Sequence, residues 1–128
     1  MASVIYVDTH VVVWLFAGMV RPFPPGAARR LESNQLLISP MVSLELQYLH
    51  EIGRVNQPSA HVVQDLANRV GLAVADTPFQ KVISVAAQQQ WTRDPFDRVI
   101  TAQAMADGVA LLTRDETIRA HCPLAVWD

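Results

Sequence analysis

Short apolar runs alternate along the chain with longer segments in which apolar residues recur at helical spacing. The short runs predict strands at 4–7, 36–38, 72–74, 109–112 and 125–127. The longer segments predict helices at 27–32, 40–53, 59–70, 78–90, 94–108 and 115–120. An alternation of this kind is typical of an α/β fold in three layers: a mainly parallel central sheet, here of about five strands, with helices on both faces.

Glu45 interrupts the apolar face of its predicted helix. At about 100° per residue, one broad arc is formed by Met41, Val42, Leu44, Leu46, Tyr48, Leu49 and Ile52. Glu45 falls at the centre of this arc, where a lone carboxylate is costly to bury. We therefore expect Glu45 to have a partner, either a side chain such as a buried arginine or a metal ion.

Composition sets the general class of protein. The chain has 128 residues, of which 51% are hydrophobic, enough for one core, so residues 1–128 are expected to form a single domain. We find no signal-peptide pattern and no run long enough to span a bilayer. The one cysteine, Cys122, favours a reducing compartment, and we expect a cytoplasmic protein. The net charge of −2 gives no overall positive field for nucleic acid.

Two predicted strands lead directly into aspartates, Asp8 and Asp115. In parallel sheets, ligands bind beyond the carboxyl ends of the strands, so both carboxylates would face one crevice if their strands were neighbours. The spacing alone does not show that they are. Each aspartate could instead be a helix N-cap, with Thr113 and Glu116 forming a capping box around Asp115.

The segment Asp94-Pro95-Phe96-Asp97 begins the helix at 94–108. Asp94 fits an N-cap before a proline at the first helical position, with Asp97 in a reciprocal capping box. Capping does not explain Glu45, however. Carboxylates that meet in one site raise each other's pKa unless a cation neutralises them. A cluster of Asp8, Glu45, Asp97 and Asp115 would therefore suit Mg²⁺ or Mn²⁺, which take oxygen ligands and leave room for a phosphate.

At these residues the chain resembles the PIN-domain ribonucleases, and within them the VapC-type toxins of bacterial toxin–antitoxin pairs. The matching segments appear in the family's order and nearly fill the chain. They are VIYVDTHVVVWLF, SPMVSLELQYLHEIGRV, RDPFDRVITAQAMADG and ALLTRDETIRAHCPLAVW. The combination of RDPFDR, a helix rich in small residues and LLTRD is specific, whereas a first strand ending in aspartate is not.

The resemblance implies a PIN-like sheet in which the first and fourth strands are neighbours. It also implies metal-dependent endonucleolytic cleavage of RNA, a cognate antitoxin protein and a homodimer. By position, the family's acids are Asp8, Glu45, Asp97 and Asp115; Asp97 is chosen over Asp94 because it directly precedes the VITAQA helix. Asp8 and Asp97 would be the main ligands of the metal, Asp115 would complete the site, and Glu45 would ligate or orient the attacking water. Thr9 or Thr113 would hold a ligating carboxylate.

Two other functions stay open from the sequence. An aspartyl-phosphate phosphatase would use Asp8 as nucleophile, but His10 stands where that class has a second aspartate. A non-catalytic module would use the acids to bind a partner's arginine.

The remaining polar and aromatic candidates are less decisive. The four histidines are expected to be structural or solvated, since they share no metal-type spacing. Candidates for phosphate contact are Arg93, Arg98, Arg114 and Arg119. Trp14 and Phe16 would line a groove or, more commonly, pack in the core.

Overall fold

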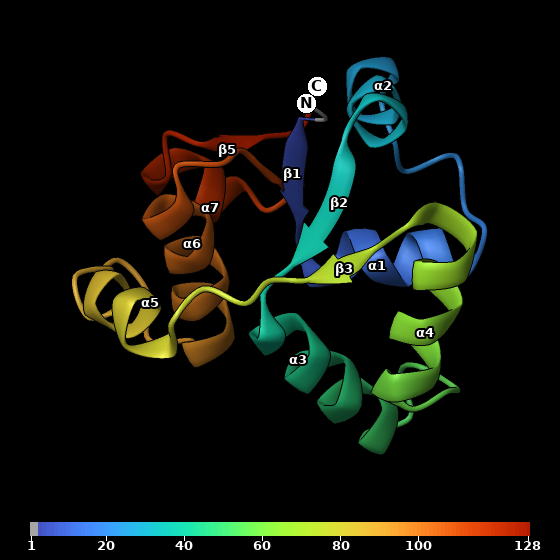
Figure 1. The fold of residues 1–128 in the computed structure, drawn as a ribbon, viewed down its shortest axis with the longest axis horizontal. Coiled ribbons are helices and arrows are strands. Elements are labelled where there is room, and N and C mark those ends of the chain that lie inside the picture. Colours follow the sequence, from blue (N-terminus) through green and yellow to red (C-terminus); the bar gives the residue numbers. More distant parts are fainter. Residues whose placement is uncertain (1–2) are drawn as a thin grey trace.

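Five parallel strands form the central sheet of the computed structural model, which describes residues 3–128 (Figure 1). The strands are β1 (Val4–Val7), β2 (Gln35–Ile38), β3 (Ala73–Val74), β4 (Leu111–Leu112) and β5 (Ala125–Val126). Their order is β3-β2-β1-β4-β5, so β1 is central and pairs with β4 through Tyr6–Leu111 and Val7–Leu112. The expected parallel sheet and the adjacency of the first and fourth strands are both confirmed.

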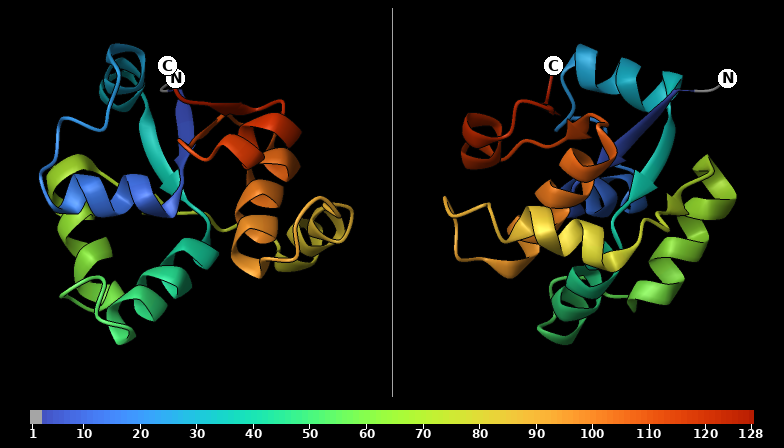
Figure 2. Two further views of the ribbon diagram at one scale, coloured as in Figure 1. Left: turned by 180° about the vertical axis from the view of Figure 1, so that it is seen from behind. Right: turned by 60° about the vertical axis from the view of Figure 1, so that its left-hand side comes forward.

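Helices cover both faces of the sheet (Figure 2). They are α1 (Thr9–Phe16), α2 (Pro25–Ser33), α3 (Pro40–Glu51), α4 (Ser59–Val70), α5 (Phe79–Ala86), α6 (Pro95–Asp107) and α7 (Glu116–His121). Helices α1, α3 and α4 pack against one another, and α5 packs on α6. From β1 the chain adds β2 and β3 on one side of the sheet, and it then crosses to add β4 and β5 on the other side. Right-handed crossovers that run in opposite directions along a sheet place their helices on opposite faces. Among residues 3–128, no helix is both long and apolar enough to cross a membrane.

The strands are short and almost entirely apolar because helices bury them on both faces. Ile5, Val7, Leu111 and Leu112 are almost fully buried, and the two β4 residues have no exposed surface. A strand that is buried on both faces has no polar side, which is why these runs lack the alternation typical of a half-exposed strand.

The apolar arc of α3 is wider than its buried face, which corrects the sequence interpretation of Glu45. Val42 and Leu46 are fully buried, but Leu44 is 57% exposed, Tyr48 49% and Ile52 49%. Glu45 lies at the border between these two sets rather than at the centre of a buried face. The helical pattern shows which residues share a side of α3, but it does not show where the neighbouring elements end.

Predicted helix boundaries shift at α2 and α5, and helix α1 was not predicted from the sequence. Helix α2 begins at Pro25, two residues early, because a proline needs no hydrogen-bond partner in the first turn. Helix α5 ends at Ala86 rather than at residue 90, since the Arg98 guanidinium caps the carbonyls of Ala86 and Ala87 at 3.1–3.3 Å. Helix α1 begins at Thr9, which makes Asp8 its N-cap residue.

A buried polar network fixes α6 against the sheet. The Tyr6 hydroxyl donates to Asp107, and the Gln103 amide donates to the Thr77 hydroxyl at 2.9 Å and to Asp107 at 3.2 Å. Burial and the neighbouring Asp107 carboxylate raise the pKa of Tyr6 to about 12, so the hydroxyl stays a donor. The network ties the last turn of α6 to β1, and so sets the position of the first turn, which carries Asp97.

Gly26 lies against the backbone that follows β5. A Cβ atom at this position would lie 2.2 Å from the carbonyl carbon of Asp128, so no side chain fits there without moving that backbone. The Arg30 guanidinium also donates to the Asp128 carbonyl oxygen at 2.8 Å. The start of α2 and the segment after β5 are therefore packed together.

Candidate functional site

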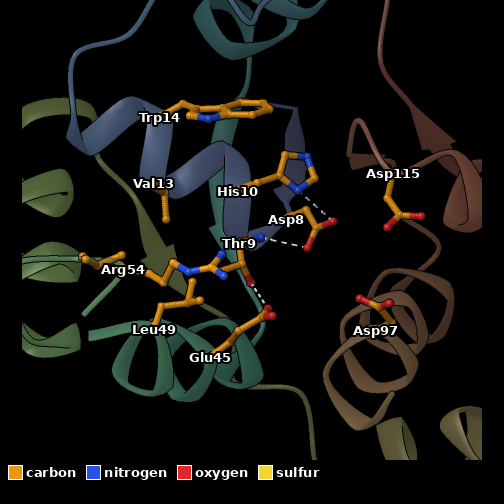
Figure 3. A pocket seen from close by; sticks show the side chains of 11 residues that line it. Asp8, Thr9, His10, Val13, Trp14, Glu45, Leu49, Arg54, Asp97 and Asp115 are labelled. Atoms are coloured by element: carbon orange, nitrogen blue, oxygen red, sulfur yellow. Dashed lines mark hydrogen bonds and ion pairs between the residues drawn. The ribbon is translucent and has the colours of Figure 1, made fainter. Parts of the chain in front are cut away.

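Four carboxylates from separate elements face one cleft of about 370 Å³ at the carboxyl ends of β1 and β4 (Figure 3). Asp8 follows β1, Glu45 lies on α3, Asp97 lies in the first turn of α6, and Asp115 precedes α7. The other lining residues are Thr9, His10, Val13, Trp14, Leu49, Arg54 and Val55. Figure 3 shows Asp8 and Glu45 on one side of the cleft, with Asp97 and Asp115 facing them from the other. All four predicted site residues are thus brought together.

Asp8 is held rigidly at the end of β1. It is 5% exposed. One carboxylate oxygen accepts the backbone N–H of Thr9 at 2.8 Å, and the other accepts the Thr113 hydroxyl at 2.7 Å. The Thr113 hydroxyl in turn accepts the backbone N–H of Asp115 at 3.1 Å. Thr113 therefore links the two strand-end aspartates and does not cap α7, as the alternative capping box would require. The cap of α7 is Asp115, which accepts the N–H of Ile118 at 2.9 Å.

Glu45 finds its partner in a hydroxyl group. The Thr9 hydroxyl donates to the Glu45 carboxylate, so the buried arginine considered from the sequence is not its partner. Burial raises the pKa of Glu45, and the negative charges of Asp8 and Asp94 add to this, while the Thr9 hydrogen bond opposes it. Thr9 thus contributes its N–H to one acid and its hydroxyl to another.

Asp97 is the most perturbed acid of the cleft. Burial, followed by the negative charges of Asp94, Asp8, Asp115 and Glu45, raises the pKa of Asp97 to about 7. Its neighbour Asp94 is an exposed N-cap that accepts the N–H groups of Phe96 at 2.8 Å and Asp97 at 3.1 Å. The predicted reciprocal capping box does not form, because the Asp94 N–H donates to the Thr92 hydroxyl and not to the Asp97 carboxylate. The Asp97 carboxylate therefore points into the cleft without a capping role.

The raised pKa of Asp97 predicts that the metal-free protein loses stability as the pH rises from about 4 to about 7. The folded state holds the Asp97 proton more tightly than the unfolded chain, whose carboxyl has the ordinary pKa of 3.8. Between these two pKa values only the unfolded chain is deprotonated at this residue, so a rising pH favours unfolding until the folded state also loses the proton near pH 7. Thermal melts in a chelator should show a melting temperature that falls between about pH 4.5 and 7 and levels off above about pH 7, and Asp97→Asn should remove the Asp97 contribution to this slope. An equal slope in both proteins would contradict this assignment.

His10 belongs to the cleft, although the sequence analysis set all four histidines aside. Its Nε2 accepts the backbone N–H of Arg114 at 2.9 Å, and its Nδ1 lies 3.5 Å from an oxygen of Asp8. Burial lowers the pKa of His10, against the opposing charges of Asp8 and Asp115. Since Nε2 is an acceptor, the proton of the neutral ring lies on Nδ1, toward Asp8. His10 therefore positions Asp8 relative to the loop before α7.

The arginine and aromatic candidates divide between the cleft and the scaffold. Arg98 is a structural cap of α5, so its expected role in phosphate contact is not supported. Arg114 lies over the Trp14 ring, with its guanidinium carbon 5.8 Å from the ring centroid. Trp14 lines the cleft, whereas Phe16 packs against His61. Sequence reasoning missed Arg54, which follows Gly53 in a loop without periodicity and lines the cleft.

The chemistry of the donors fits a hard divalent cation. All four acids supply carboxylate oxygens, and burial together with the neighbouring negative charges raises the pKa of Asp97, a charge excess that a cation would offset. Within residues 3–128, however, no three His, Cys, Asp or Glu side chains are already close enough to hold an ion. The acids thus line a cleft rather than a preformed cage.

Residues 5–122 match the family model of the PIN domain. The chain belongs to the PIN domain family. This PIN domain is 30% identical over 131 residues to Ribonuclease VapC22 of Mycobacterium tuberculosis. The alignment covers 98% of this chain and 99% of that protein. The resemblance drawn from the sequence is confirmed.

Solved structures share the fold of this PIN domain at low identity. VapBC2 from Rickettsia felis, bound to a promoter DNA fragment, has a TM-score of 0.66 at 17% identity and covers 98% of this chain and 99% of that chain. A toxin–antitoxin complex from Klebsiella pneumoniae has a TM-score of 0.60 at 20% identity and covers 94% of each chain.

Proposed function

We propose that residues 1–128 form a single PIN domain that acts as an endoribonuclease of the VapC type, the toxin of a type II toxin–antitoxin pair. The reaction is hydrolysis of RNA phosphodiester bonds with Mg²⁺ or Mn²⁺. One observation carries the proposal: four carboxylates from four elements face the same cleft at the carboxyl edge of the sheet. The relative named Ribonuclease VapC22 supports it over the whole length of the chain. A cytoplasmic location stays a prediction from the sequence.

Each acid has a distinct place in this mechanism. Asp8 and Asp97 would hold the cation from opposite sides of the cleft, and Asp115 would complete the site directly or through water. When bound, the cation supplies positive charge for the phosphate and lowers the pKa of a water molecule. Glu45, held by the Thr9 hydroxyl, would ligate the cation or orient the attacking water as its proton acceptor.

The test is cleavage of a mixture of defined RNAs with and without a divalent cation. We expect internal cleavage in Mg²⁺ or Mn²⁺, none after chelation, and recovery when the cation is restored. The melting temperature should also rise with Mn²⁺, because the cation relieves the repulsion around Asp97. Cleavage that continues unchanged in chelator would overturn the metal-dependent mechanism. Hydrolysis of a small phosphoester in place of RNA would favour the phosphatase alternative.

We also propose an antitoxin protein as partner and a homodimer. Three structural neighbours are described as VapBC assemblies and one as a toxin–antitoxin complex, which supports an antitoxin for this chain. Leu44, Tyr48 and Ile52 form an exposed apolar stripe on α3 that is suited to a protein contact. An antitoxin arginine entering the acidic cleft would explain inhibition, so the binding-module function and the enzyme function are compatible.

A further inference from the structure

We propose that a groove of arginine and aromatic side chains, leading away from the acidic cleft, binds the single-stranded RNA next to the cleaved bond. This inference rests on the proposed ribonuclease function and adds to it the place where the substrate is held. The groove, called the arginine groove below, consists of two hollows. The inner hollow is lined by His10, Trp14, Arg114 and Asp115, and the outer hollow by Arg21, Pro22, Phe23, Pro24, Arg114, Arg119, Trp127 and Asp128.

The arginine groove is continuous with the acidic cleft. His10, Trp14 and Asp115 line both the cleft and the inner hollow, which has a volume of about 320 Å³. Arg114 lines both the inner hollow and the outer one, whose volume is about 720 Å³. Figure 3 shows His10 beside Asp8, with Trp14 farther from Asp8 on the same side of His10 as the groove. A strand whose phosphate lies among the acids therefore has an open path toward Arg21 and Arg119.

Positive charge gathers in the groove although the chain carries a net charge of −2. Its three guanidinium groups belong to Arg21, Arg114 and Arg119, against the carboxylates of Asp115 and Asp128. All three arginines are exposed. Among residues 3–128, the ion pairs are His10–Asp8 and Arg69–Asp65, so none of these arginines is neutralised by a carboxylate. Exposed, uncompensated arginines are the usual contacts for a phosphate backbone.

Partly buried aromatic rings lie between these arginines. Trp14 lies 5.8 Å from Phe23 and 6.0 Å from Trp127 between ring centroids, and Phe23 lies 5.8 Å from Trp127. All three rings are partly exposed, so each presents some of its surface to the groove. Unpaired bases stack on such rings whatever their identity, whereas paired bases are already stacked on each other. The combination of rings and guanidinium groups therefore favours single-stranded nucleic acid over an acidic peptide, which would engage only the arginines.

The test is RNA binding measured by tryptophan fluorescence in a variant that does not cleave. The background carries Asp97→Asn and Trp91→Phe, because Trp91 stacks on His121 outside the groove. Because the chain has three tryptophans, the fluorescence of this variant comes from Trp14 and Trp127, which both line the groove. Titration with a short single-stranded RNA in Mg²⁺ should quench their fluorescence. Adding Arg119→Gln or Phe23→Leu should weaken binding by about fivefold or more.

A matched control removes the same charge elsewhere. Arg29 is an exposed arginine of α2 that does not line the groove, so Arg29→Gln should bind RNA as the background does. Arg119→Gln should also reduce the dependence of log Kd on log salt concentration by about 0.7, the contribution of one phosphate contact on a single strand. Circular dichroism melts check that Phe23→Leu remains folded. Because Arg119 is exposed, Arg119→Gln tests the groove independently of any loss of packing.

The outcomes separate this proposal from the proposed function. If the wild-type protein cleaves RNA while Arg119→Gln and Phe23→Leu bind RNA like Arg29→Gln, the proposed RNA groove is wrong and the proposed nuclease function is retained. If the groove variants bind RNA more weakly but the wild-type protein cleaves no RNA, the proposed RNA groove is retained and the proposed nuclease function is wrong. Stronger quenching by an oligoglutamate peptide than by RNA would overturn the groove as an RNA site and point to an acidic protein partner.

Discussion

Asp97→Asn is expected to abolish RNA cleavage, with a loss of at least ~10³-fold, while the metal-free protein stays folded. Asparagine keeps the shape of the side chain but removes the negative charge that the cation needs. The same change relieves the repulsion that raises the pKa of Asp97 to about 7, so the melting temperature in chelator should be equal or higher. Cleavage of a defined RNA and thermal melts measure the two effects.

The matched control is Asp94→Asn, the same chemical change three residues earlier. Asp94 is exposed and caps α6 by accepting the N–H groups of Phe96 and Asp97, and asparagine is an equally good cap. This variant should therefore keep both its stability and its cleavage activity. The opposite result, an inactive Asp94→Asn protein and an active Asp97→Asn protein, would show that the site acid of this segment is Asp94.

Thr113→Val is expected to weaken binding of the divalent cation by roughly 10–100-fold and to reduce cleavage with it. The Thr113 hydroxyl is fully buried, donates to Asp8 at 2.7 Å and accepts the N–H of Asp115 at 3.1 Å. Valine has nearly the same shape, so the change removes both hydrogen bonds and leaves the packing intact. Loss of a buried polar link should also cost about 1–3 kcal/mol of unfolding free energy. Calorimetric titration with Mn²⁺ measures the affinity.

Thr101→Val provides the comparison inside the same core. Thr101 is also fully buried, but in the described part of the chain its hydroxyl has no hydrogen-bond partner. Removing an unpaired buried hydroxyl should leave the stability unchanged or raise it by up to about 1 kcal/mol. Cation affinity should not change. Equal losses in the two variants would mean that Thr113 acts only through packing, not through its bond to Asp8.

The strands were predictable because burial on both faces leaves them short and purely apolar. The acids at their ends were predictable for a related reason: a parallel sheet places strand ends, and whatever follows them, at one edge. The spacing could not show that β1 and β4 are neighbours, since strand order depends on the path of the connecting helices. That adjacency came from the family resemblance.

The rest of the site depends on contacts between segments far apart in the sequence. His10 meets the backbone of Arg114 only because β1 lies beside β4. Glu45 was found for a partly mistaken reason, since several residues of its apolar arc are exposed to solvent. Arg98 follows Asp97 directly and still points away to cap α5. Local pattern shows which side of an element a residue occupies, but its partners are decided by the packing of the whole fold.

The missing side chain of Gly26 in the first turn of α2 leaves room for the chain segment that follows β5. The backbone of Asp128 fills the place where a Cβ atom would be, and Trp127, next to it, forms part of the wall of the arginine groove. A methyl group at position 26 would therefore require the backbone of Asp128, the neighbour of Trp127, to move. In the proposed RNA groove, a side chain at position 26 would therefore disturb the end of the wall that carries Trp127.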